Sequence, residues 1–310
     1  MYKHIKRDDR VCIALMLKQD YTHTEISKEL GFHRTTISRE IERNSDENGM
    51  YRVWIANKKA KENRKNSKIE KRIIDNDKKI KSKVIKYLKQ DWSPEQFEGI
   101  FGLISHMTIY RYIGRHPELK RYLRRQGRKR RNYGTKSNLS RYQANKRSIH
   151  ERSVEVKSRK RVGDWEGDTI VGKERKLRIV TYVDRKSGYL VADLTTAKAD
   201  DIHLLTKQQF NNKPCFTITY DNGSEFALHK MIEKNTKAFV YFADKGKPQQ
   251  RGSNENANGL LRQYFPKGSS FATITNKDVQ RVVRRLNSRP RKRLSYLTPR
   301  QVFEGVQFKS

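Results

Sequence analysis

Cysteine, acidic residues and long apolar runs are all scarce in this chain, and each shortage excludes a class of protein. Among 310 residues there are only two cysteines, Cys12 and Cys215, so neither a disulfide framework nor a zinc cluster is indicated. No segment approaches the roughly 18 consecutive apolar residues of a membrane-spanning helix. The first residues, MYKHIKRDDR, lack the apolar stretch of a signal peptide. We therefore expect a soluble intracellular chain.

The shortage of acidic residues leaves a large positive charge. Lysine and arginine number 70 against 34 aspartates and glutamates, which gives a formal net charge of +36. A positive excess of this size indicates what the protein binds rather than how it folds, and the usual partner is the phosphate backbone of a nucleic acid. High net charge also favours disorder. Aromatic residues make up 10% of the chain, however, and most lie in periodic segments, which favours two or three folded domains.

A helix-turn-helix pattern lies near the amino terminus. After a first helix whose apolar residues are Cys12, Leu15 and Met16, Thr22 and Glu25 form a capping box that opens a second helix. A glycine turn leads to a third helix, with isoleucines four residues apart on its inner face. Its outer face is suited to the major groove of DNA. The expected DNA contacts are Arg34, Thr35, Ser38 and Arg39. An ordinary helical hairpin is the alternative.

The pattern recurs between residues 84 and 116. Ser93, Pro94 and Gln96 predict the start of a helix, and Ser105 opens another that runs to Ile113. Ile113 is expected to face inward together with either Met107 or Ile109. The residues expected to lie partly outward are His106, Thr108, Arg111 and Tyr112, of which the first three are expected to contact DNA. We interpret this segment as a second helix-turn-helix.

A strongly basic run follows, KRYLRRQGRKRR at residues 120–131, in which eight of the twelve residues are lysine or arginine. It could lie along a phosphate backbone or in a minor groove, with Arg128, Lys129 and Arg130 as contacts. A solvated run that becomes ordered only on DNA is the compatible alternative. The predicted domains are 1–57 (first helix-turn-helix), 58–83 (basic linker or helix), 84–116 (second helix-turn-helix), 117–162 (basic linker), 163–290 (catalytic core) and 291–310 (tail).

From residue 163 the sequence pattern becomes typical of β-strands. Three successive strand-like runs, DWEGDTIV, LRIVTYVD and YLVADLTT, are separated by short turns. A helical stretch from Ala199 to Phe210, the run CFTITYD, a helix from Ser224 to Lys234 and the run AFVYFA follow. Three strands followed by alternating helix and strand predict an α/β core with a mixed sheet.

Three carboxylates of this core are candidates for a catalytic site. Active groups in an α/β sheet tend to lie at strand ends. Asp168 lies in the first strand, Asp221 ends the fourth, and Glu255 stands near the start of a later helix, with 33 residues between the last two (255 − 221 = 34). Asn258 and Arg262 share a helix face with Glu255, because they are three and seven positions further on. We expect both of them to contact DNA.

Each carboxylate also has an alternative interpretation. Asp164 and Glu166 lie on the same strand face as Asp168 and compete with it. Asp221 could be a turn residue in the sequence Asp-Asn-Gly. Glu255 could simply favour the N-terminus of its helix through the helix dipole.

The longer motifs resemble a known family. WEGDT, YDNG and RGSNENANGLLRQYFPKG, in this order, resemble the DDE transposases of bacterial insertion sequences. The strings TTISREIERN, WSPEQF, SIHERS and LNSRPRKRLSYLTPRQVF narrow the resemblance to the IS-thirty family and cover nearly the whole chain. The resemblance implies all-α helix-turn-helix domains followed by an α/β ribonuclease-H-like core of the retroviral-integrase type.

The resemblance also implies an activity. Asp168, Asp221 and Glu255 would bind two Mg²⁺ ions, which Mn²⁺ could replace; such ions can hold both the attacking and the leaving oxygen of a phosphodiester. The protein would bind the terminal inverted repeats of its element, free a 3′-hydroxyl, join the ends and integrate into target DNA. At least a homodimer on DNA is expected, in the bacterial cytoplasm at the nucleoid.

Two other functions stay open at this stage. One is a DNA-binding regulator that keeps the fold without catalysis, which the presence of all three acids and Arg262 disfavours. The other is a ribonuclease-H-like nuclease that cuts strands but never joins them. A retroviral integrase is disfavoured because its zinc-binding histidine and cysteine cluster is absent from the sequence.

Overall fold

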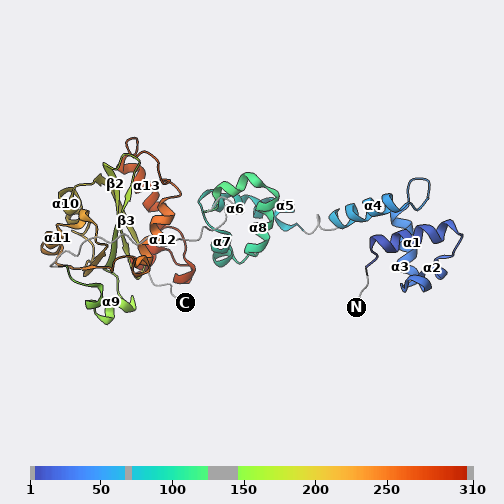
Figure 1. Ribbon diagram of the computed structural model, residues 1–310, viewed down its shortest axis with the longest axis horizontal. Helices are drawn as coiled ribbons and strands as arrows, with labels where there is room; N and C mark the ends of the chain where they lie inside the picture. Colours follow the sequence, from blue (N-terminus) through green and yellow to red (C-terminus); the bar gives the residue numbers. More distant parts are fainter. Residues whose placement is uncertain (1–3, 67–71, 125–145, 306–310) are drawn as a thin grey trace. The chain divides into compact units, whose positions relative to one another are not determined.

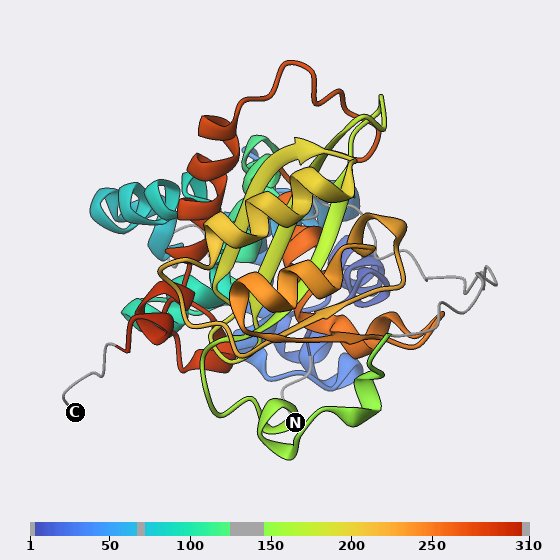
Figure 2. The same ribbon diagram turned by 90° about the vertical axis from the view of Figure 1, so that its left-hand side faces the viewer.

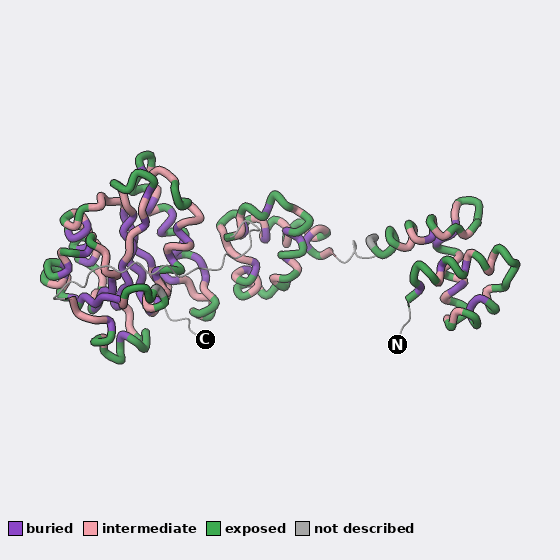
Figure 3. The backbone as a smooth tube through the Cα atoms, in the orientation of Figure 1, coloured by how far each residue is buried: buried purple, intermediate pink, exposed green. Residues whose placement is uncertain are grey.

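The computed structural model describes residues 4–66, 72–124 and 146–305 (Figure 1). The chain forms two compact units, Met1–Ser82 and Lys83–Ser310. Buried residues, purple in Figure 3, collect along the strands and on the inner sides of the helices that cover them. No helix in the described part of the chain is both long and apolar enough to cross a membrane.

The first unit contains the predicted helix-turn-helix. Its helices are α1 (Arg7–Lys18), α2 (His23–Leu30), α3 (Arg34–Asn44), α4 (Val53–Asn66) and α5 (Ile73–Asn76). Thr22 and Glu25 form the predicted capping box at the start of α2, and Gly31 ends that helix with a left-handed φ of 66°. One isoleucine from each of the first three helices is fully buried in a shared core: Ile13, Ile26 and Ile37.

Two details of this unit differ from the sequence prediction. Cys12 and Leu15 are exposed, whereas Arg10 is buried in α1. The guanidinium of Arg10 lies 2.6 Å from the carboxylate of Glu40, and this neutralisation allows a charged residue to occupy the inner face. The helix α4 also continues past residue 57, the expected domain boundary, because it packs against α1 and α3.

The second unit begins with the second helix-turn-helix. Its elements are α6 (Lys78–Lys89), which crosses the unit boundary, α7 (Pro94–Phe101), α8 (His106–Arg115) and η1 (Pro117–Tyr122). Ser93 and Gln96 form the predicted capping box, and Gly102 ends α7 with a φ of 59°. Ile109 faces inward and Met107 does not. Tyr112, predicted to lie partly outward, is buried, because its ring packs 4.3 Å from that of His116.

The core of the second unit is a five-stranded sheet in the order β3-β2-β1-β4-β5. The strands are β1 (Asp164–Val171), β2 (Leu177–Asp184), β3 (Leu190–Thr196), β4 (Thr217–Tyr220) and β5 (Phe239–Phe242). The first three strands are antiparallel, which short turns allow, and β4 and β5 run parallel to β1 and to each other. This order and these directions are those of the predicted ribonuclease-H-like fold.

Helices cover both faces of the sheet. On one face lie α10 (Ala199–Gln209) and α11 (His229–Thr236), in front of the strands in Figure 2, and they contribute Ile202 and Ile232 to the core. On the other face lie α12 (Gly252–Leu261) and α13 (Asn276–Asn287), with core residues such as Leu261 and Val279. The sheet is therefore buried on both sides, and α12 crosses β1 and β2.

The segment after residue 290 is part of this core rather than the expected tail. It contains η5 (Lys292–Leu294) and α14 (Pro299–Phe303). The ring of Phe303 stacks on that of Tyr189 at 4.4 Å and meets Trp165 edge-on at 5.5 Å. This aromatic packing anchors the segment on the core while its basic side chains Lys292, Arg293 and Arg300 stay exposed, which a basic sequence with few apolar residues did not predict.

Candidate active site

Two of the three predicted carboxylates stand level with each other on neighbouring strands. β1 and β4 run parallel, with Glu166 opposite Thr219. The same register, continued by two residues, places Asp168 beside Asp221. β4 ends at this point while β1 continues, so the two side chains lie at the carboxyl end of a parallel strand, where active groups of α/β sheets commonly lie.

A single arginine bridges this pair. Arg251, at the end of η4 (Pro248–Arg251), has its Nη2 3.1 Å from Oδ2 of Asp221 and its Nη1 3.6 Å from Oδ1 of Asp168. Nη1 also donates a hydrogen bond to the carbonyl of Gly167 at 2.9 Å. The Arg251 side chain is 13% exposed and that of Asp221 is 41% exposed. The two carboxylates are therefore placed to share one cation at a site that solvent reaches.

Asp168 is the more enclosed of the two. Its Oδ1 accepts a hydrogen bond from the backbone amide of Thr169 at 2.9 Å, and its Oδ2 accepts one from Nδ2 of Asn258 at 2.8 Å. Burial raises the pKa of Asp168; the charge of Arg251 opposes this shift and that of Asp221 adds to it. The Asp168 carboxylate is thus oriented by two hydrogen-bond donors, and a nearby positive charge stabilises its ionised form.

The two competing acids of β1 have structural partners. Asp164 and Glu166 are completely buried. Asp164 pairs with Arg161 at 3.0 Å, and Glu166 pairs with Arg185 at 3.0 Å. Asp168, whose side chain is 25% exposed, is the one acid of the three on this strand face that solvent reaches.

Glu166 also fixes the start of α12. Its Oε2 accepts a hydrogen bond from the backbone amide of Asn254, and the side chain of Asn254 donates to the carbonyl of Glu166, at 3.0 and 2.8 Å. Arg251, Glu255 and Asn258 are four and three positions apart, so they project from one face of the helix. Because Arg251 and Asn258 both contact Asp168 on this face, Glu255 is carried on the side of α12 that faces the aspartates.

Glu255 itself stands apart from the pair. It is exposed, and it has no hydrogen bond or ion pair with any residue that the structure describes. Within the described ranges, no three histidine, cysteine, aspartate or glutamate side chains converge as metal ligands. The chemistry of the donor set nevertheless fits a divalent cation, since Asp168 and Asp221 already share a cationic group and carboxylate oxygens are the ligands Mg²⁺ prefers.

Arg251 was not among the residues predicted for the site. The available signal was its spacing, because a residue four positions before Glu255 lies on the same face of a helix. The helix was expected to begin later in the sequence QQRGSNEN, which hid this relation. In the structure α12 begins at Gly252, directly after Arg251.

The other two polar residues of this helix face are engaged inside the protein. Asn258 accepts a hydrogen bond from Thr181 at 3.0 Å in addition to its bond to Asp168. Arg262 donates to the carbonyls of Val171 and Phe265 at 3.2 and 3.4 Å, and burial lowers its pKa. In this arrangement Arg262 ties α12 to the end of β1, and DNA contact by either residue stays a prediction.

In the first helix-turn-helix, two of the four predicted DNA contacts are free. Arg34 and Arg39 are exposed on α3. The hydroxyl of Thr35 lies 2.8 Å from Nδ1 of His33, and the hydroxyl of Ser38 lies 3.1 Å from Nδ1 of His23. Hydroxyls with one local partner can still bond a base, but the two arginines have the greater reach.

In the second helix-turn-helix, Arg111 is the exposed member of the predicted set. The ring of His106 pairs with the carboxylate of Glu98, and Thr108 shares a hydrogen bond with the capping residue Ser105 at 3.2 Å. These contacts hold α8 against the end of α7. The predicted contacts Arg128, Lys129 and Arg130 lie outside the described residues.

Comparison with known proteins finds relatives over nearly the whole chain. Residues 1–44 match a helix-turn-helix domain family. The chain is 37% identical over 320 residues to the transposase for insertion sequence element IS4351 of Bacteroides fragilis, covering 99% of this chain and 97% of the relative. It is 32% identical over 325 residues to transposase InsI for insertion sequence element IS30A of Escherichia coli (strain K12), covering 97% and 83%.

Among solved structures, the catalytic core domain of BIV integrase matches 46% of this chain and 94% of its own length, with 19% identity and a TM-score of 0.38. This likeness is too low to bear on function. The sequence relatives, by contrast, match at more than 30% identity from one end of the chain to the other.

Proposed function

Because the chain belongs to the IS30 family of bacterial insertion-sequence transposases, we propose that it cuts and joins DNA at the ends of its own element in a divalent-metal-dependent reaction. The observation that carries this proposal is the pairing of Asp168 and Asp221 around Arg251, next to the helix that bears Glu255. Paired carboxylates at the ends of such strands suit phosphoryl transfer, because the cations they would hold can neutralise developing negative charge.

Asp168, Asp221 and Glu255 are the proposed ligands of two Mg²⁺ ions, with Mn²⁺ as a substitute. Bound ions of this kind make an attacking oxygen more nucleophilic and stabilise the charge on the leaving oxygen. The chain's own residues position this set: Asn258 holds Asp168, and the bonds between Asn254 and Glu166 hold α12 on the sheet.

The proposed reaction has two stages of the same chemistry. Hydrolysis of one strand at each end of the element frees a 3′-hydroxyl. That hydroxyl then attacks a second phosphodiester, forming one P–O bond as another breaks, so no covalent protein–DNA intermediate is required. Joining of the two ends gives a circular form of the element, which a second round inserts into target DNA.

The helix-turn-helix units are the proposed readers of the terminal inverted repeats. Arg34 and Arg39 on the exposed face of α3, and Arg111 on α8, are the best placed to reach base edges. Because the two ends of an element must be held together for joining, we propose that at least two copies of the chain assemble on DNA.

The deciding experiment uses a supercoiled plasmid that carries the gene with its native flanks. Purified protein and the variant Glu255→Gln are incubated with it in Mg²⁺ or in EDTA, and the product ends are mapped. Asp200→Asn is the matched control, because Asp200 is also an exposed acid in the first turn of a helix, on the opposite face of the sheet. We expect Mg²⁺-dependent cuts and joins at the element's ends with wild type and Asp200→Asn, and none with Glu255→Gln.

The other functions give different products. Binding at the ends without any strand change, in wild type and variant alike, would identify a regulator. Cuts without joined strands would identify a nuclease. Scattered nicks that are the same for wild type and Glu255→Gln would remove Glu255 from the proposed site.

A further inference from the structure

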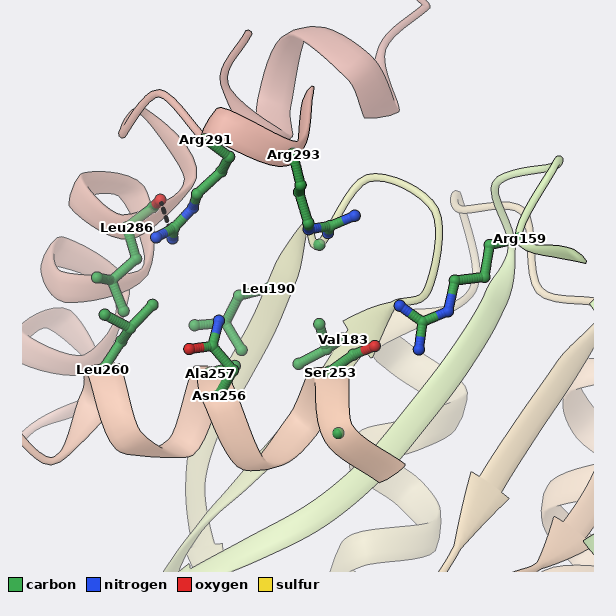
Figure 4. Close-up of a pocket in the computed structure, with 12 residues that line it drawn as sticks. Arg159, Val183, Leu190, Ser253, Asn256, Ala257, Leu260, Leu286, Arg291 and Arg293 are labelled. Carbon is green, nitrogen blue, oxygen red and sulfur yellow. Dashed lines mark hydrogen bonds between the residues drawn. The ribbon is translucent and has the colours of Figure 1, made fainter. Parts of the chain in front are cut away.

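A pocket of about 230 Å³ lies against the face of α12 that points away from the aspartates (Figure 4). Its floor is apolar and includes Val183, Leu190 and Leu260. Its rim is cationic: Arg159, Arg291 and Arg293 border it from two segments far apart in the sequence, as the labelled side chains in Figure 4 show. Nothing in the proposed strand cleavage accounts for three arginines at this place.

In the part of the chain that the structure describes, none of these arginines is held in an ion pair. Arg291 donates a hydrogen bond to the carbonyl of Leu286 at 3.2 Å, and Arg293 donates one to the carbonyl of Lys186 at 2.9 Å. Those acceptors are neutral, and within the described residues none of the three arginines has a carboxylate within ion-pair distance. The pocket therefore presents uncompensated positive charge, which an anion would stabilise.

Mutual repulsion strengthens this point. Burial, together with the nearby charges of Arg289 and Arg293, lowers the pKa of Arg291 to about 10. Burial also lowers the pKa of Arg293, and the charge of Arg159 adds to that shift. The charges of Asp184 and Glu166, which lie beyond ion-pair distance, oppose the shift. Arginines that repel one another around a hollow are costly to keep unless something negative enters it.

The segment that carries two of them is rigidly built. The amide of Arg291 donates to the carbonyl of Leu297, and the amide of Tyr296 donates back to the carbonyl of Arg291, at 2.9 and 3.0 Å. Ser295 and Tyr296 both have left-handed φ values, 52° and 64°, which are uncommon for residues other than glycine. Such strain persists where the surrounding structure holds it and is often found at binding sites.

Two further features aim at the same hollow. Arg159 also has a left-handed φ, 56°, at the end of α9 (Val154–Ser158), and in Figure 4 its guanidinium turns toward Ser253. The Oγ of Ser253 is buried and has no hydrogen-bond partner among the residues that the structure describes. A buried hydroxyl without a partner costs free energy that a ligand oxygen would recover. Donors from α9, α12 and the segment after α13 thus surround one pocket.

We propose that this arginine pocket, the hollow bordered by Arg159, Arg291 and Arg293, binds a phosphate of the DNA backbone. The inference rests on the proposed function, which supplies DNA as the anion. Residues 253 and 255 are two positions apart, so they project about 200° apart around α12. The pocket phosphate and the reacting phosphate would therefore lie on opposite sides of one helix, about 10–12 Å across. This second contact would fix the position of the DNA strand relative to Glu255.

The test measures DNA binding by the full-length protein in EDTA, so its outcome does not depend on strand cleavage. The variant is the double substitution Arg159→Gln with Arg293→Gln, both exposed residues. Arg281→Gln is the control, because it removes an exposed arginine of α13 that does not line the pocket. Fluorescence anisotropy with a duplex of the element's end gives the affinity over a range of salt concentrations.

One lost phosphate contact reduces the slope of log affinity against log salt by about 0.9. We expect this reduction, with a roughly tenfold loss of affinity at low salt, for the double variant and an unchanged slope for Arg281→Gln. Thermal melting in inorganic phosphate, at constant ionic strength, separates two sources of the anion. If phosphate protects wild type but not the double variant while the DNA slopes agree, the pocket takes small anions and the DNA assignment is overturned. Equal slopes with equal protection overturn the site altogether.

Discussion

At the scale of single residues, Arg251 places one positive charge between two negative ones. Asp168 and Asp221 lie within 3.6 and 3.1 Å of its guanidinium, which takes the position of a shared counter-ion. A divalent cation that binds both aspartates must therefore displace this side chain. The free-energy cost of binding such a cation would include breaking the two ion pairs of Arg251.

This competition predicts the behaviour of Arg251→Gln. Without metal, the variant should lose about 1–3 kcal/mol of stability, because two neighbouring carboxylates are left without their cation. Addition of Mg²⁺ or Mn²⁺ should then raise its melting temperature more than that of wild type, since no arginine has to leave. Differential scanning calorimetry with and without metal measures both effects. The control Arg281→Gln should respond to metal as wild type does, and equal metal shifts in all three proteins would rule out the competition.

At the scale of helices and strands, local signals in the sequence were sufficient for most of the fold. The capping boxes at Thr22 and Ser93 are present, and so are the five strands and their mixed order. These features depend on residues that are close together in the sequence, so a single sequence is enough to predict them. The buried position of Arg10 and the packing of Phe303 depend on partners far along the chain, Glu40 and Tyr189, and the sequence alone does not reveal such pairs.

The same limit applied to the candidate site. Asp168, Asp221 and Glu255 could be named from motifs, but their relation to Arg251 depends on where α12 begins. Helix starts are uncertain by a few residues when no capping residue marks them, and α12 has no side-chain cap. A shift of that size changes which side chains share a face.

Close contact between β1 and β4 makes a prediction for Gly167. A Cβ added there would lie 2.3 Å from the ring of Tyr220, which is completely buried, next to Tyr182. Gly167→Ala should therefore cost roughly 1–3 kcal/mol through overpacking. It should also reduce cleavage, because Asp168 and Asp221 directly follow the two residues forced apart.

Chemical denaturation and the plasmid assay measure these two losses. Gly252→Ala is the matched control, because a Cβ there meets nothing within 4 Å and its φ is not left-handed. That control should be neutral or slightly stabilising. If the two alanine variants had the same stability, the close approach of Tyr220 would not constrain this strand.

At the scale of the whole molecule, a net charge of +36 explains affinity for DNA in general but not the recognition of one sequence. A large excess of positive charge favours binding to DNA of any sequence, and this binding weakens steeply as salt rises. Specificity requires side chains that reach base edges, and the exposed face of α3 is where the structure offers them.

Arg39→Ala tests this division. If Arg39 reads a base, the variant should lose roughly 1–3 kcal/mol on the element's end and little on unrelated DNA. Competition binding at fixed salt measures both affinities. Arg7→Ala, an exposed arginine of α1, is the control and should weaken both complexes slightly and equally. An equal loss on both DNAs for Arg39→Ala would make it a phosphate contact.

One face of α12 carries Glu255 toward the aspartates and the other lines the arginine pocket. This restricts changes in the length of the helix. A single inserted or deleted residue between Arg251 and Arg262 would turn everything beyond it by about 100°. Glu255 or Asn258 would leave the side of the aspartates, and Ser253 or Leu260 would leave the pocket. The exposed turn at residues 47–49 lies outside both the candidate site and the pocket. Surviving copies of this gene should therefore accept changes of length in that turn and only substitutions in this helix.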